Sequence, residues 1–252
     1  NSTYFISYEH FCNEIELINN TFSSIKVSSG IQYGGSIAVC FKNHLYSYTN
    51  LTYTDCHFIN NENAHDKDII NNGGAIQYGY SSSIAQTRIV FENCEFRGNQ
   101  CLGKGGALSI SINQSLTIIN CTFEDNAASQ GSTIYIYGQI VKEDDNEPDI
   151  AESKMESISI IDCQFIGNKG NGDVTGILNE EGNIKFQNIY ISSCTFYDNG
   201  ENNDQMLIQL FSINTIFENN IVKYSNSTQS SGIIKLNALE HFELSKCTFT
   251  NC

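Results

Sequence analysis

The sequence predicts an all-β fold, a right-handed parallel β-helix of about eight coils with three strands each. Three observations support this: a motif that recurs along the chain, apolar pairs that precede each copy, and small residues that follow it. Composition agrees, because Lys and Arg together number only 13 and Pro occurs once, whereas Asn, Ile, Ser and Thr abound. Residues that favour helix surfaces are therefore few, and β-branched residues that suit strands are many.

The recurring motif is Cys-x-Phe-x-x-Asn, and five copies are complete: Cys56/Phe58/Asn61, Cys94/Phe96/Asn99, Cys121/Phe123/Asn126, Cys163/Phe165/Asn168 and Cys194/Phe196/Asn199. Three weaker copies extend the series: Asn20/Phe22, Asn220/Val222 and Cys247/Phe249. The Cys positions fall 26 to 42 residues apart, which argues against the fixed period of leucine-rich repeats.

An apolar pair lies five and three residues before each Cys position, as Leu116 and Ile118 do before Cys121. A spacing of two places both side chains on one face of a strand. The next step, three residues to the Cys, is odd, so the chain must turn a corner there. The residue before the Cys position tolerates the left-handed backbone of such a corner: Asn19, Asp55, Asn93, Asn120, Asp162, Ser193 and Asn219.

Small residues open a third strand in each coil, most clearly Gly73-Gly74-Ala75-Ile76 and Gly105-Gly106-Ala107-Leu108. Glycine lets the backbone pass close to the neighbouring coil. Three strands, two tight corners and one variable loop then complete a coil. Coils stacked at about 4.8 Å place Cys over Cys, Phe over Phe and Asn over Asn. The rule for parallel connections favours a right-handed, pectate-lyase-like solenoid.

The repeats make residues 1–252 a single β-helix segment, and we expect it to belong to a longer chain because it stops within a repeat. One acidic excursion, residues 138–157, contains the run Glu143–Asp149. Its spacing does not match an EF-hand calcium loop, so we expect a solvated loop.

Ten cysteines divide into two groups. Six share one inward position and are expected to form a core ladder of small buried side chains: Cys56, Cys94, Cys121, Cys163, Cys194 and Cys247. The parallel Cβ vectors of stacked coils suit disulfides poorly. The other four, Cys12, Cys40, Cys101 and Cys252, are the disulfide candidates, with Cys12–Cys40 the favoured pair. No Cys-x-x-Cys occurs and the histidines are scattered, so neither a metal nor a cofactor is expected.

Six sequons for N-linked glycans are present, at Asn1, Asn19, Asn50, Asn113, Asn120 and Asn226. They favour a secretory route and an extracellular or cell-surface location. A net charge of −15 makes nucleic acid an improbable partner.

The paired motifs Phe-x-x-Asn and Gly-Gly-Ala-(Ile/Leu) resemble the repeat of the polymorphic outer membrane proteins, β-helical surface proteins of chlamydiae with similar repeats in protists. The pairs Phe58/Gly73, Phe96/Gly105 and Phe123/Gly131 carry this resemblance, which covers the chain from about Ile15 to Cys252. The last two coils depart from the pattern. The resemblance implies an adhesin-like surface protein.

Catalytic chemistry is not indicated. Polysaccharide lyases and hydrolases of this fold need carboxylates that converge on one face, and the lyases also need a basic residue beside them. The only arginines, Arg88 and Arg97, lie in no acidic strand cluster. The third strands carry weak acids and bases instead: Gln77, Tyr78, Ser109, Ser111, Tyr135 and Tyr137.

We therefore expect a non-enzymatic, elongated surface module that acts as an adhesin or as a structural assembly component. Its partners would be other surface proteins or further copies joined end to end. The alternative is a β-helix that binds or cleaves polysaccharide, and the sequence does not separate an adhesin from a filament or coat subunit.

Overall fold

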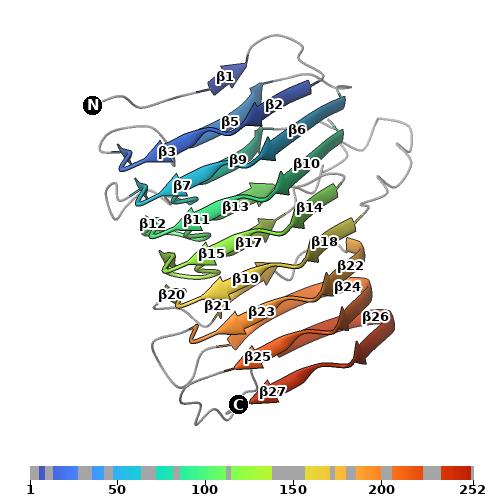
Figure 1. Ribbon diagram of the computed structural model, residues 1–252. Helices are drawn as coiled ribbons and strands as arrows, with labels where there is room; N and C mark the ends of the chain where they lie inside the picture. The colour runs from blue at the N-terminus through green and yellow to red at the C-terminus, as the bar shows by residue number, and fades with distance from the viewer. Residues whose placement is uncertain are drawn as a thin grey trace.

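The computed structural model describes residues 6–8, 14–27, 36–42, 48–63, 72–81, 86–111, 115–137, 157–170, 174–179, 186–199, 206–223 and 234–250. In these ranges the fold is all-β, built from parallel strands that stack along one axis (Figure 1). None of these segments is a helix that could span a membrane. The all-β fold of parallel strands that the sequence predicts is confirmed.

The large sheet has fourteen strands and consists of two arms. The first arm holds the strands that small residues introduce: β1 (Ile6–Tyr8), β5 (Ile37–Lys42), β9 (Ile76–Ser81), β13 (Leu108–Ser111), β17 (Ile134–Tyr137) and β21 (Val174–Asn179). The second arm holds the strands with the apolar pairs: β2 (Glu14–Ile18), β6 (Tyr48–Thr54), β10 (Gln86–Glu92), β14 (Ser115–Ile119), β18 (Ser157–Ile161) and β22 (Phe186–Ser192). β24 (Met206–Glu218) joins the arms, and β26 (Ile234–Ser245) pairs with β24.

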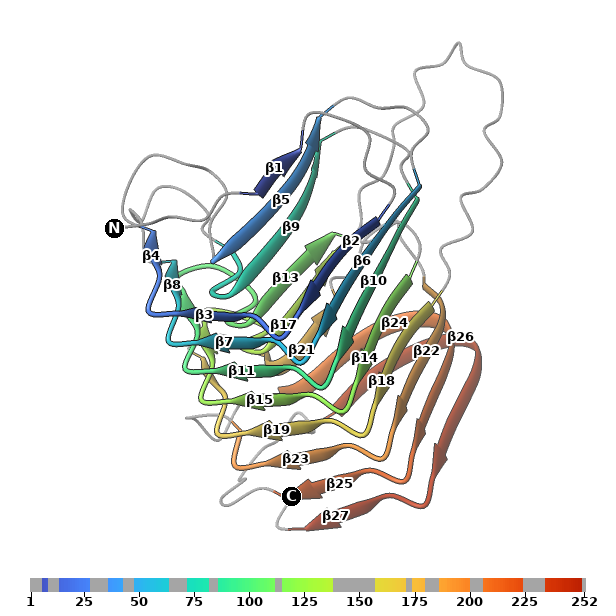
Figure 2. The ribbon, with the colours of Figure 1, turned by 45° about the horizontal axis from the view of Figure 1, so that its top comes forward.

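A second sheet, the Phe sheet, holds the Cys-x-Phe strands: β3 (Thr21–Ser23), β7 (His57–Ile59), β11 (Glu95–Arg97), β15 (Thr122–Glu124), β19 (Gln164–Ile166), β23 (Thr195–Tyr197), β25 (Ile221–Lys223) and β27 (Thr248–Thr250). A third, small sheet holds strands of two residues each: β4 (Lys26–Val27), β8 (Glu62–Asn63), β12 (Gln100–Cys101), β16 (Ala127–Ala128) and β20 (Lys169–Gly170). Figure 2 shows these sheets curled around a common interior.

The corner between the second arm and the Phe sheet is confirmed. All seven residues predicted there have positive φ, between 51° and 56°, and Lys246 continues the series in the last repeat. A second corner lies just before each Asn position, where Ser24, Asn60, Asp125 and Asp198 also have positive φ. Asn and Asp tolerate this left-handed backbone better than most residues, which explains their abundance at both corners.

The core is a set of columns in which equivalent residues stack from repeat to repeat. The Phe column runs through Phe58, Phe96, Phe123, Phe165 and Phe196, with neighbouring ring centroids 4.7 to 5.0 Å apart and nearly parallel planes. These side chains are almost completely buried, and each such burial stabilises the fold by about 1.5–3 kcal/mol. The predicted stacking of Phe123 over Phe96 and of Ile118 beside Phe91 is confirmed.

The glycine pair permits a close approach of neighbouring repeats. A Cβ atom on Gly106 would lie 2.2 Å from the carbonyl oxygen of Ser132, and one on Gly74 would lie 2.1 Å from that of Gly106. Gly105 has a φ of +75°, which other residues rarely adopt.

The structure corrects the expected three separate strands per repeat in two ways. First, the small sheet adds a short fourth strand after the Asn position in several repeats. Second, β24 runs without interruption from one arm of the large sheet to the other, with a register shift between Ser212 and Asn214. No glycine or proline interrupts residues 206–218, so the strand continues where other repeats insert a loop.

Candidate interaction surfaces

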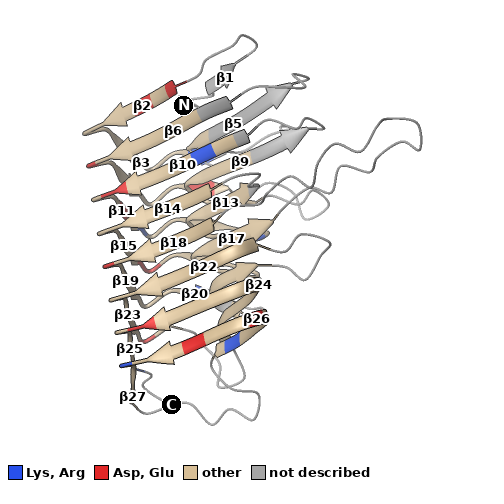
Figure 3. Cartoon of the chain, turned by 90° about the vertical axis from the view of Figure 1, so that its right-hand side faces the viewer, with Lys and Arg blue, Asp and Glu red and all other residues tan. Residues whose placement is uncertain are grey.

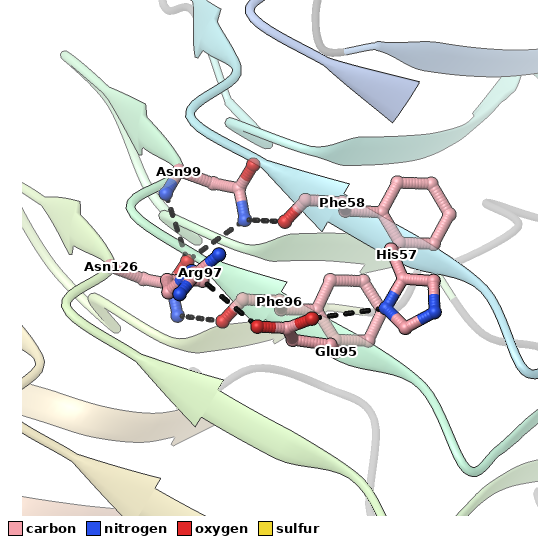
Figure 4. Close-up of polar contacts among 7 residues, drawn as sticks. All are labelled: His57, Phe58, Glu95, Phe96, Arg97, Asn99 and Asn126. Atoms are coloured by element: carbon pink, nitrogen blue, oxygen red, sulfur yellow. Dashed lines mark hydrogen bonds and ion pairs between the residues drawn. The ribbon is translucent and has the colours of Figure 1, made fainter. Parts of the chain in front are cut away.

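The asparagines of the motif form a buried ladder at the second corner (Figure 4). The Asn99 side-chain amide donates to Phe58 O at 2.8 Å and to Asn126 Oδ1 at 3.0 Å. The Asn99 backbone N–H donates to the same Asn126 oxygen at 3.0 Å. The pattern repeats at Asn61, Asn126 and Asn168, so each buried amide bonds the repeats on both sides. These amides therefore hold neighbouring repeats together and are not exposed to a ligand.

The cysteine ladder lies inside the first corner, as predicted. Cys56, Cys94, Cys121, Cys163 and Cys194 are buried free thiols, and Cys247 is half-buried in the last repeat. The Cys56 thiol donates to Leu17 O in the preceding repeat at 3.3 Å and to Thr54 O at 3.4 Å. Burial raises the pKa of the Cys56 thiol, which disfavours the reactive thiolate.

The disulfide candidates find no support within the described residues. Cys101 is a buried free thiol that donates to Gly105 O, and burial raises its pKa to about 12. The prediction that Cys101 forms a disulfide is wrong in this structure, because its thiol is free and is buried inside the small sheet. Cys12, Cys252 and the side chain of Cys40 lie outside the described residues, so the Cys12–Cys40 pair stays a prediction.

The sequons that the structure describes differ in accessibility. Asn19 and Asn120 are exposed corner residues, as expected. Asn50 lies inside β6 rather than beside a strand, and its side-chain oxygen is buried without a hydrogen-bond partner. Asn1, Asn113 and Asn226 lie outside the described residues, as does the acidic excursion, except that Ser157 is the first residue of β18.

The outer face of the Phe sheet carries a small polar group (Figure 4). Glu95 lies 3.0 Å from His57 Nδ1 and 3.4 Å from Arg97 Nε, and the three side chains come from the neighbouring strands β7 and β11. Arg97 thus forms an ion pair with Glu95 and lies opposite Glu124 of β15 in the strand register, on an exposed surface where such pairs are worth little.

The outer face of the second arm carries no charged side chain on three neighbouring strands (Figure 3). β14, β18 and β22 contain no Lys, Arg, Asp or Glu, and they place Ser115, Thr117, Ser157 and Ser159 outward beside Tyr190. Exposed Arg88, on β10, lies in register between Asn50 and Ser115, with no carboxylate directly opposite.

The polar residues of the first arm are mostly buried. Gln77, Tyr78, Ser109 and Tyr135 are all at most 5% exposed. Tyr78 lies in the core and its hydroxyl bonds Thr87 Oγ1 at 2.9 Å. Tyr135 packs instead with Val174 and Leu178 in a second apolar cluster. The side chain of Ser111 is outside the described residues.

The two ends of the stack present core positions to the outside. In the last repeat Phe242, Leu244 and Phe249 are 48%, 52% and 43% exposed, whereas their equivalents Leu116, Ile118 and Phe123 are 0% exposed. In the first repeat Ile15, Leu17 and Phe22 are half-buried. β2 and β3 are edge strands at one end, and β26 and β27 at the other (Figure 1).

No protein-family model matches this chain, and it matches no curated protein and no solved structure. Among the described residues, no three His, Cys, Asp or Glu side chains are placed to hold a metal ion together. The functional interpretation therefore rests on the residues and surfaces above.

Proposed function

We propose that this chain is a non-enzymatic, elongated extracellular or cell-surface glycoprotein module, adhesin-like or structural in role. The rod would be a right-handed parallel β-helix of about eight coils, similar to the repeats of the polymorphic outer membrane proteins. It would reach the surface by the secretory route and present N-linked glycans and loops to other surface proteins.

One observation carries the proposal: the side chains that recur in the repeat make their contacts with neighbouring repeats. The Asn and Cys side chains of the motif are buried and bonded to neighbouring repeats, and the Phe rings pack on one another. The repeated motif thus builds the rod. Contacts with other molecules would be made by the outer faces, the glycans and the ends. This supports a scaffold more directly than it supports catalysis.

The location is tested on intact cells. Antibodies raised against the folded chain should label cells without permeabilisation, and brief external protease treatment should remove the signal. A cytoplasmic protein measured in parallel should resist the same treatment. Signal that appears only after permeabilisation would refute the surface location.

The absence of catalysis is tested with a panel of uronic and neutral polysaccharides, with and without Ca²⁺, followed by reducing ends and by absorbance of unsaturated product. We expect no turnover above background. Turnover lost in Asp144→Asn or Asp145→Asn would place a site in the acidic excursion. Turnover lost in Arg88→Ala or Arg97→Ala would place it on the outer faces.

A second candidate, binding of a neutral polysaccharide without cleavage, is favoured by the uncharged face of β14, β18 and β22. Rows of hydroxyl groups beside Tyr190, whose own hydroxyl donates to Glu218 on the next strand, offer hydrogen bonds and a stacking surface. Affinity electrophoresis in gels that contain each polysaccharide tests it. Retardation that Ser159→Lys abolishes and Gln164→Lys, on the exposed side of the Phe sheet, leaves intact would support this alternative.

A further inference from the structure

Arg88 is an unpaired cation at the border of the uncharged face of β14, β18 and β22. It is exposed on β10, the neighbour of β14, and among the described residues no ion pair involves its guanidinium. The only other arginine, Arg97, lies 3.4 Å from Glu95, and Lys26 lies 2.6 Å from Glu62. The donors of Arg88 are therefore available to a ligand.

The described carboxylates of the second arm lie well away from Arg88. Glu14, the nearest in the strand register, is two strands away, which corresponds to about 10 Å between backbone positions. Glu92 is four residues further along β10, or about 13 Å. Exposed charges at such separations are largely screened at physiological ionic strength. The surface around Arg88 is therefore locally positive, although the chain as a whole has a net charge of −15.

A row of neutral hydrogen-bonding side chains begins beside Arg88. In the strand register Arg88 is followed by Ser115 on β14, and then by Ser157 on β18 and Asn188 on β22. Three strand steps make this row about 14 Å long. Hydroxyl and amide groups can bond the hydroxyls of neutral sugars, and the guanidinium fork can hold a planar carboxylate through two parallel hydrogen bonds. The row thus offers one position for an anionic group beside several neutral positions.

We propose that this face binds a polysaccharide in which isolated uronic acid residues are attached to a neutral chain, and that Arg88 binds the carboxylate. A single cation favours such a polymer over its fully neutral counterpart. A dense polyanion is disfavoured, because most of its carboxylates would find no cation and the net charge of −15 would repel them. The inference deepens the second candidate function, polysaccharide binding without cleavage, and rests on it.

The test uses the purified chain produced in bacteria, so that no glycan on Asn50, which lies opposite Arg88 on β6, covers the guanidinium. The probes are glucuronoxylan oligosaccharides, which carry single glucuronic acid branches on a neutral xylan backbone, and the same oligosaccharides after reduction of the carboxyl group to an alcohol. The two probes differ only in the anionic group. Isothermal titration calorimetry at low ionic strength gives a dissociation constant for each probe.

Three variants complete the design. Arg88→Gln removes the cation, and Lys169→Gln is the matched control, because Lys169 is exposed on β20 in the small sheet and the same charge is lost away from the second arm. Ser157→Leu obstructs the row of neutral side chains without changing the charge. Circular dichroism and melting temperature establish that each variant folds.

Wild type and Lys169→Gln should bind the acidic oligosaccharide about fivefold more tightly than its reduced form, which is the upper end expected for an exposed ion pair. Arg88→Gln should bind both forms equally, with the affinity that wild type has for the reduced form. The preference of wild type should shrink in about 1 M salt, because screening weakens the ion pair. Ser157→Leu should weaken the binding of both forms.

Equal affinity of wild type for the acidic and reduced forms would overturn the inference and leave the binding of neutral polysaccharide in place. A preference that persists in Arg88→Gln would overturn it as well, because a different cation would then bind the carboxylate. If wild type binds neither form, the second candidate function fails together with the inference. The surface labelling of intact cells is independent of all three outcomes.

Discussion

The side chain of Asn126 donates to Asn168 Oδ1 at 3.0 Å and to Phe96 O at 2.9 Å, so one amide bonds both neighbouring repeats. Its own oxygen accepts from the Asn99 side chain and backbone, each at 3.0 Å. We expect Asn126→Ala to lower the free energy of unfolding by about 3 kcal/mol or more, because it leaves several buried polar groups without partners.

The measurement is urea unfolding followed by circular dichroism. Asn188→Ala is the control, because Asn188 also bonds an asparagine, Asn214, but on an exposed face. It should change stability by about 0.5 kcal/mol or less. Equal effects in the two variants would contradict the importance of burial in this ladder.

Phe123 lies between Phe96 and Phe165 in the Phe column, with centroid distances of 4.8 and 5.0 Å. Phe123→Ala should cost about 3–5 kcal/mol, because rings fixed on both sides cannot collapse into the cavity. Phe249→Ala removes a ring from the equivalent position of the last repeat, where Phe249 packs next to Val222 and is already 43% exposed, and should cost clearly less. Unfolding curves at low protein concentration give both values, and a similar cost at both sites would argue against a rigid column.

Asn120 and Asn19 are exposed at corners, so both should carry glycan when the chain passes through a eukaryotic secretory route. Asn50 should be occupied less, because it lies within β6 with its side-chain oxygen buried. Peptide mass spectrometry before and after enzymatic deglycosylation measures this occupancy. Thr122→Ala removes the sequon at Asn120 while keeping the corner residue, and should delete one glycan. Native material with every sequon bare would argue against the secretory route.

The buried thiols should resist alkylation in the folded chain and react fully after unfolding. Among those described, Cys247 should react first, since it is half-buried in an edge repeat. Mass spectrometry after timed exposure to iodoacetamide orders the sites. Rapid native labelling of Cys121 would show that the core opens more readily than its packing implies.

The buried thiol of Cys101 should also make the free energy of unfolding depend on pH. Burial raises its pKa from 9.0 to about 12, so the folded state favours the neutral thiol. The resulting stability is complete below about pH 9 and is lost as the pH rises towards 12, because the unfolded chain ionises first. Urea unfolding at several alkaline pH values should show a flatter profile for Cys101→Ala than for wild type. Parallel pH profiles for wild type and Cys101→Ala would contradict the assignment of this pH dependence to Cys101.

The sequence by itself determined the repeat, the inward columns and the first corner. A spacing of two identifies one face of a strand locally, and the odd step before each Cys position demands a turn whatever the distant contacts are. Asn93 and Asp162 could therefore be placed at corners, and Phe123 in the core, from neighbours in the chain alone.

Only the tertiary structure decided the small sheet, the fused strand β24 and the accessibility of the outer faces. A strand of two residues such as Ala127–Ala128 has no periodicity to detect and exists because adjacent repeats bond to it. The partners of the Asn126 side-chain amide likewise lie 27 to 42 residues away in the chain, beyond any local pattern. Burial and pairing across repeats depend on how the repeats stack, and that stacking is a property of the assembled fold.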